Sequence, residues 1–140
     1  MQPAMPTEIE ELCETIEDCY EFTLSYAAKG VAADEGSDLG RQLREKLSQA
    51  AAAMRRLEGA GWALLKTGQA TPVEKYGAFF EVMARDAQSA AAAVELVLAQ
   101  PVIGPQMIDN LNASIHLRAL LTDLFLVTEI LAARKPVAAE

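Results

Sequence analysis

The side chains best suited to chemistry are a single histidine, His116, and two cysteines, Cys13 and Cys19. A structural zinc site or a Ser-His-Asp triad needs several such groups at a recognisable spacing, and this set provides none. The cysteines lie six positions apart on one predicted helix, which places them poorly for a disulfide. We therefore predict no catalytic residues and no bound cofactor, with a divalent metal ion as the one alternative.

Polar residues around His116 fall into two arcs when the segment 105–134 is drawn as one helix of about 100° per residue. The narrower arc comprises Asp109, Asn112, His116 and Asp123 and runs between two apolar flanks. Either this arc points inward, where buried polar groups need partners, or the two flanks pack against two surfaces, as in a dimer. We favour the second interpretation and predict a homo-oligomer, most simply a homodimer, that associates through 105–134.

His116 also permits a different interpretation, in which it accepts a phosphoryl group as in histidine phosphotransfer bundles. The residues after it, Leu117-Arg118-Ala119-Leu120, lack the Lys-Gly pair that such domains place there. Phosphotransfer therefore remains an alternative rather than the favoured function.

The elements that must position these residues are helices, because the chain is rich in alanine, 51% hydrophobic and only 6% aromatic. Capping residues and apolar spacing predict an all-α, antiparallel four-helix bundle that forms a single domain over 1–140. The predicted helices span about 7–29, 37–60 or 37–67, 72–99 and 105–134. The uncertain boundary reflects Gly59-Ala60-Gly61, where the second helix could end.

Local signals support the helix starts. Thr7 and Glu10 have the spacing of a capping box, and Ser37 is suited to cap the second helix. Thr71-Pro72-Val73-Glu74 predicts an N-cap at Thr71 and a proline at the first helical position. Apolar residues at spacings of three and four predict the buried seam of the second helix, namely Leu39, Leu43, Leu47, Ala50, Met54, Leu57 and Gly61.

The formal charge of −8 excludes a surface that coats nucleic acid, since such surfaces need clustered Lys and Arg. The most apolar stretch, 119–133, contains two acidic residues and is shorter than the roughly 20 residues of a membrane span. The first residues lack the basic and apolar regions of a signal peptide, so we expect a cytoplasmic protein with no membrane partner.

Short motifs along the chain resemble the ferritin-like superfamily, in particular its small rubrerythrin-like bundles of uncharacterised function. The similar segments are Asp18 with Glu21 and Ala27-Ala28, then Trp62-Ala63-Leu64-Leu65-Lys66, Arg85-Asp86-Ala87 and His116. The resemblance implies a ferritin-like bundle in which 59–69 would belong to the crossing between the second and third helices.

The di-metal site of that superfamily is incomplete in this chain. Such a site needs two Glu-x-x-His motifs, whereas this chain has one histidine, with Ala113 three residues before it, and has Arg85 at an expected glutamate position. What the resemblance leaves is a partial, mononuclear site. Its predicted ligands are His116, Asp109 and Glu21, together with Asp86 or Glu58.

We therefore predict a non-catalytic, homo-oligomeric helical bundle that acts as a binding or scaffold module in the cytoplasm. The first alternative is a ferritin-like stress or metal-handling protein that binds iron, zinc or manganese at a residual site around His116. The second alternative is the histidine phosphotransfer module.

Overall fold

The computed structural model of the chain describes residues 6–29 and 37–134, and every regular element in these ranges is a helix. The helices are α1 (Glu8–Ala28), α2 (Asp38–Lys66), α3 (Val73–Leu98), α4 (Pro105–Ala113) and α5 (Ile115–Arg134). The all-α prediction is confirmed.

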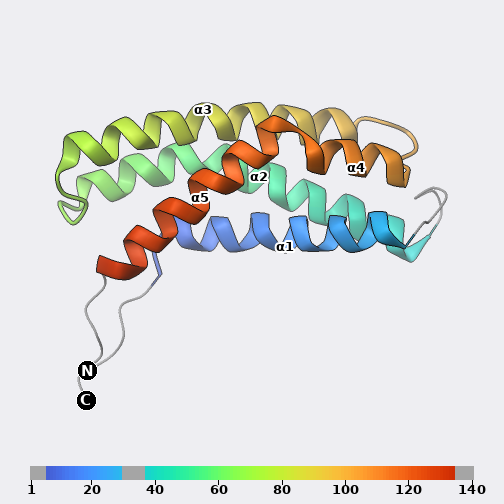
Figure 1. Cartoon of the computed structure of the whole chain (residues 1–140), viewed down its shortest axis with the longest axis horizontal. Helices are drawn as coiled ribbons and strands as arrows, with labels where there is room; N and C mark the ends of the chain where they lie inside the picture. The colour runs from blue at the N-terminus through green and yellow to red at the C-terminus, as the bar shows by residue number, and fades with distance from the viewer. Residues whose placement is uncertain (1–5, 30–36, 135–140) are drawn as a thin grey trace, which may run out of the picture.

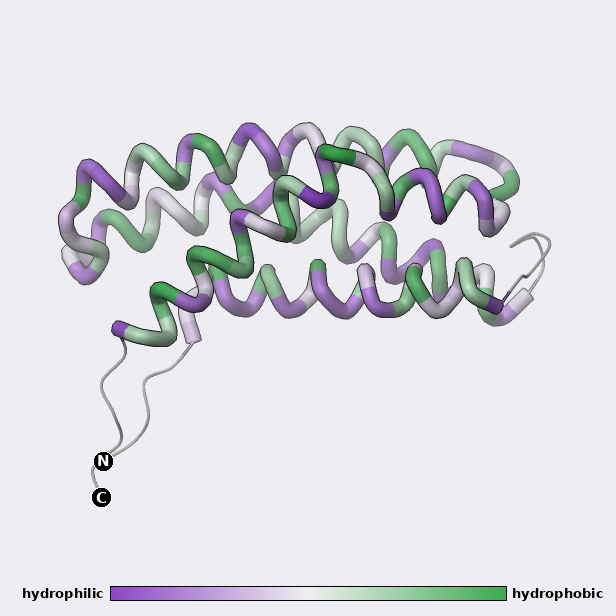
Figure 2. Tube along the Cα trace, in the orientation of Figure 1, coloured by the Kyte–Doolittle hydropathy of each residue, from purple (hydrophilic) through white to green (hydrophobic). Residues whose placement is uncertain are grey.

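Three long helices lie side by side, and the last two cover them (Figure 1). α2 packs between α1 and α3, α4 lies along one end against α1 and α3, and α5 crosses from α3 towards the first turns of α1. α5 is hydrophobic along most of its length (Figure 2). None of the described helices combines the length and the hydropathy needed to cross a membrane.

The predicted caps of α1 and α2 are confirmed. Thr7 Oγ1 accepts the Glu10 backbone N–H at 3.2 Å, and the Glu10 carboxylate accepts the Thr7 N–H at 2.8 Å, which completes the capping box. Ser37 Oγ accepts the Gly40 N–H at 2.8 Å. Each of these bonds satisfies a backbone donor that the first turn of a helix leaves unpaired.

The predicted cap of α3 is wrong by one residue. Pro72, with extended backbone angles, is the N-cap, the helix begins at Val73, and no side chain caps it. Thr71 instead contacts the end of α5: Arg134 donates to the Thr71 carbonyl oxygen at 2.8 Å and lies 3.4 Å from its Oγ1. The turn between α2 and α3 is thereby tied to the last residue of α5.

α2 runs without interruption through Gly59 and Gly61 to Lys66, so the longer of the two predicted boundaries is the one found. The crossing over 59–69 that the resemblance implies is wrong, because 59–66 is helical and α3 begins at Val73. Gly61 faces α3, where an added Cβ would lie 3.2 Å from the Phe80 ring, whereas a Cβ at Gly59 would meet no atom within 4 Å. The glycine that faces α3 therefore sets the close approach of the two helices, and the other one makes no such contact.

Alanine substitutions at the two glycines should separate these roles. We expect Gly59→Ala to stabilise the protein by about 0.5–1 kcal/mol, since alanine favours helix and the site is open. Gly61→Ala should gain less or lose stability, because Phe80 must shift to accept the methyl group. Urea unfolding of both variants measures the difference, and equal gains would show that Phe80 does not constrain Gly61.

The predicted continuous helix over 105–134 is wrong, because the chain breaks at Ser114. Ser114 has a ψ of 134°, and its Oγ accepts the His116 backbone N–H at 3.2 Å, which is the bond of a helix N-cap. The break changes the rotation between the two halves. Asn112 is consequently buried and Asp123 half-buried, while Asp109 and His116 are exposed.

Candidate functional site

Two carboxyl groups, Asp86 on α3 and Asp123 on α5, face each other where these helices pack. Both residues are half-buried, and Oδ2 of Asp123 is buried without a hydrogen-bond partner in the described part of the chain. Ionised carboxylates are acceptors only, so a hydrogen bond between the two forms only when one of them holds a proton. The pair is therefore built to share a proton.

Burial, the hydrogen bond to Asp86 and the negative charge of that residue, in this order of size, together raise the pKa of the Asp123 carboxyl to about 7. Near neutral pH the pair thus exists partly as carboxylate with carboxylic acid and partly as two carboxylates. The ionised form places two negative charges in a partly desolvated position, which is unfavourable.

The four predicted metal ligands lie on four different helices. Glu21 on α1, Asp109 on α4 and His116 on α5 are exposed, and Asp86 on α3 is half-buried. Within 6–29 and 37–134, no three acidic, histidine or cysteine side chains are grouped as metal ligands would be. The structure brings Asp86 to Asp123, a residue outside the predicted set, and the metal site stays a prediction.

A second buried polar contact joins α1 to α4. Thr23 Oγ1 lies 3.0 Å from Asn112 Oδ1 and 2.9 Å from the Tyr20 carbonyl oxygen, and Asn112 Nδ2 is buried without a hydrogen-bond partner among the described residues. These residues line a hollow of about 10 Å³, room for one water molecule. The contact fixes α4 against α1 and offers no space for a larger ligand.

An apolar groove runs between α3 and α5, with a volume of about 240 Å³. Leu126 and Ile130, which line it from α5, are 49% and 39% exposed. The residues that line it are Lys75, Tyr76, Phe79, Phe80, Leu126, Val127 and Ile130. Apolar side chains left open to water in this way are typical of a surface that another protein covers.

A wider, acidic groove of about 450 Å³ lies on the other side of α5, against α1. Its lining comprises Glu10, Cys13, Glu14, Glu17, Phe125, Thr128, Glu129 and Ala132. Cys13 Sγ donates to Glu17 Oε1 at 3.0 Å, and burial together with Glu17 raises the pKa of the Cys13 thiol to about 12. The thiol therefore remains protonated at neutral pH and is a poor nucleophile.

α5 is unusual because it exposes large apolar side chains while its inner face is also apolar. Four of the ten large hydrophobic residues that are exposed within 6–29 and 37–134 belong to it, namely Ile115, Phe125, Leu126 and Ile130. Leu126 and Ile130 line the groove against α3, whereas Phe125 lines the groove against α1. Exposed polar residues also lie on this helix, namely Arg118, Thr122 and Glu129. Large apolar side chains that stay exposed are typical of a surface that a partner covers. The outer face of α5 is thus the surface on which a binding function can be built.

Comparison with protein-family models, with curated proteins and with solved structures finds no match to this chain.

Sequence reasoning identified Asp86 and Asp123 separately but did not pair them. Asp86 was assigned from the resemblance and Asp123 from the polar arc, and nothing in their spacing indicates that α3 and α5 bring them together. The available signal was weak: each is an acidic residue with two apolar residues one turn before it, Val82 and Met83 for Asp86 and Ala119 and Leu120 for Asp123.

Proposed function

We propose that the chain is a non-catalytic, homo-oligomeric helical protein that acts as a binding or scaffold module. In this proposal α4 and α5 together form the fourth member of an antiparallel four-helix bundle, and the protein resides in the cytoplasm, where its free cysteines, Cys13 and Cys19, stay reduced. The observation that carries the proposal is the exposed apolar face of α5.

The distribution of charge along the groove between α3 and α5 supports a second copy of the chain as the occupant. Lys75 lies at one end of this groove, one helical turn before Phe79. At the other end, Asp86 lies two turns after Phe79 on α3, and Asp123 lies one turn before Leu126 on α5. The lining of the groove is therefore apolar with Lys75 at one end, and the two carboxyl groups lie farther along the same two helices, beyond its other end.

Such a surface is complementary to itself. In a two-fold dimer the same patch of both subunits meets in opposite directions. Lys75 of one subunit would then approach the acidic pair of the other, while the apolar middle parts cover each other. A lysine near the pair would also stabilise its ionised form.

The experiment that tests the proposal compares two leucines of nearly equal exposure, Leu126 on α5 at 49% and Leu24 on α1 at 47%. We expect Leu126→Glu to shift the protein from dimer to monomer in light scattering, because it places a charge in the apolar centre of the interface. Leu24→Glu adds the same charge elsewhere and should leave the dimer intact.

A dimer that persists in Leu126→Glu would place the interface elsewhere, and equal dissociation of both variants would indicate an effect of net charge alone. Circular dichroism of both variants checks that the helices remain formed.

The metal-handling and phosphotransfer alternatives both depend on His116. Its side chain is exposed in the first turn of α5, and the described residues provide no grouped ligands beside it. Neither alternative is favoured by an observation comparable to the apolar face of α5. The ferritin-like resemblance likewise stays a prediction.

A further inference from the structure

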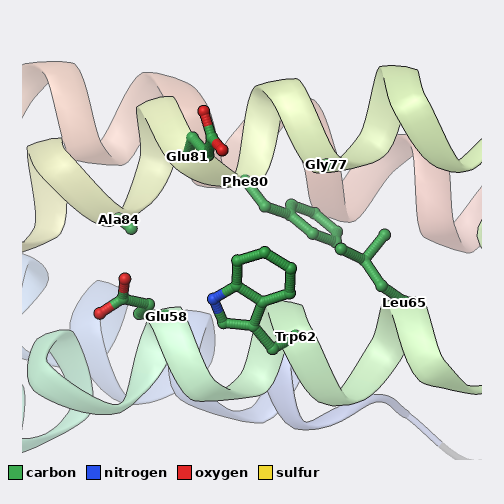
Figure 3. A pocket seen from close by; sticks show the side chains of 7 residues that line it. All are labelled: Glu58, Trp62, Leu65, Gly77, Phe80, Glu81 and Ala84. Atoms are coloured by element: carbon green, nitrogen blue, oxygen red, sulfur yellow. The ribbon is translucent and has the colours of Figure 1, made fainter.

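The only tryptophan of the chain, Trp62, lies in a groove between α2 and α3 with 53% of its side chain exposed. Its indole ring rises from α2 towards α3, with Leu65 and Phe80 on one side and Glu58 on the other (Figure 3). The residues around it enclose a pocket of about 30 Å³. That volume suits one small chemical group rather than a whole metabolite.

The pocket combines an aromatic wall with two carboxylates, Glu58 and Glu81. Glu58 Oε1 receives only a long bond of 3.5 Å from Gln88 Nε2. The structure records no ion pair for Glu81 within the described ranges, and the exposed Arg85, four residues later on α3, makes none with it. The site therefore presents negative charge beside an open aromatic face.

The chain itself shows which group fits such surroundings. Two turns before Trp62 on α2, the Arg55 guanidinium crosses to α3 and donates to both oxygens of Glu95, at 2.7 and 3.2 Å. At the far end of α3, the Arg134 guanidinium lies 5.7 Å from the centre of the Tyr76 ring. Carboxylate pairing and ring stacking are thus each satisfied by an arginine elsewhere, whereas the Trp62 pocket has both partners and no cation of its own.

We propose that the Trp62 pocket binds the guanidinium group of an arginine side chain presented by a partner protein. A guanidinium is flat, so it stacks on an indole ring while its N–H groups donate to carboxylates, a combination that the compact ammonium of lysine matches less well. The net charge of −8 attracts such a cationic partner over longer distances. The pocket lies between α2 and α3 and shares one lining residue, the buried Phe80, with the groove between α3 and α5.

Because Trp62 is the only tryptophan, its fluorescence reports on this pocket alone. We expect N-acetyl-arginine amide to produce a saturable change with a dissociation constant in the millimolar range, roughly what one cation–π contact with charged hydrogen bonds provides. N-acetyl-citrulline amide has the same shape without the charge and should bind at least about 10-fold more weakly. N-acetyl-lysine amide should fall between the two.

The double variant Glu58→Gln with Glu81→Gln should weaken binding of the arginine compound by about 10-fold. Its matched control is Glu45→Gln with Glu74→Gln, which removes the same charge from exposed positions of α2 and α3 outside the pocket and should change binding less than about 2-fold. Equal binding of citrulline and arginine, or equal loss in both double variants, would overturn the proposal. So would the absence of a saturable change with the arginine compound.

Discussion

Asp123→Asn is expected to make the protein more stable at pH 8 and to flatten its stability between pH 4 and pH 8. The pKa of Asp123 is about 7 in the folded protein against 3.8 for an ordinary aspartate. Between these values the folded carboxyl holds a proton that the unfolded chain has already released, so the stability contributed by this group falls as the pH rises. Above pH 7 Asp123 is ionised in the folded protein as well, and the full loss of stability that this ionisation causes is present.

The size of the effect follows from the position of the group. Ionising a fully buried carboxyl group beside another carboxylate would cost several kcal/mol of stability. Asp123 is only half-buried, however, and water screens part of the repulsion from Asp86. We expect a gain of about 1–2 kcal/mol for Asp123→Asn at pH 8 and almost none at pH 4. Urea unfolding at both pH values gives the two differences.

Asp109→Asn is the matched control, because Asp109 is exposed on α4 and outside the carboxyl pair. It should follow the unmodified protein at both pH values. Both variants are compared at low protein concentration, where the proposed dimer dissociates and no Lys75 of a second subunit lies near the pair. A destabilising effect of Asp123→Asn at pH 8 would then mean that a favourable contact holds the ionised Asp123, and the description of the pair as mutually repelling would be wrong.

Leu121→Gln and Phe125→Gln should differ sharply in stability, although both residues lie in the segment predicted to form the dimer. Leu121 is 5% exposed and belongs to the core, whereas Phe125 is 49% exposed beside the acidic groove. Glutamine at Leu121 buries an amide without partners and removes apolar packing, at a cost of about 2–4 kcal/mol. At Phe125 the loss of unfolding free energy should stay below about 1 kcal/mol.

Urea unfolding at low protein concentration measures both losses in the monomer, where the interface does not contribute. Similar losses for the two variants would contradict the orientation of α5, since a rotation of the helix would be needed to bury Phe125 as deeply as Leu121. Glutamine is preferred to glutamate here because Phe125 already faces three glutamates of α1 across the groove and has Glu129 one turn later on its own helix.

Much of the fold could be predicted because its signals are local. The predicted seam of α2 is buried from Leu43 to Gly61, because these residues repeat at helical spacing, and its first member, Leu39, is half-buried in the first turn. The caps at Thr7 and Ser37 depend only on residues within one turn. Such features survive whatever the tertiary arrangement is.

The break at Ser114 could not be predicted in the same way. In the sequence, Ser114 is one polar residue within an apolar helical pattern, and a helix tolerates such a residue. Only the packing of α4 against α1 and of α5 against α3 determines that it caps a new helix. The pairing of Asp86 with Asp123 depends on that break as well, because a continuous helix would have given Asp123 a different rotation. The sequence therefore identifies Asp86 and Asp123 as candidate residues but does not predict that they contact each other.

The measurement that tests self-association most directly is the mass of the unmodified protein by sedimentation equilibrium over a range of concentrations. We expect a dimer of about 30 kDa, twice the 15.1 kDa of one chain, that dissociates on dilution. A mass of 15.1 kDa at every concentration would contradict it.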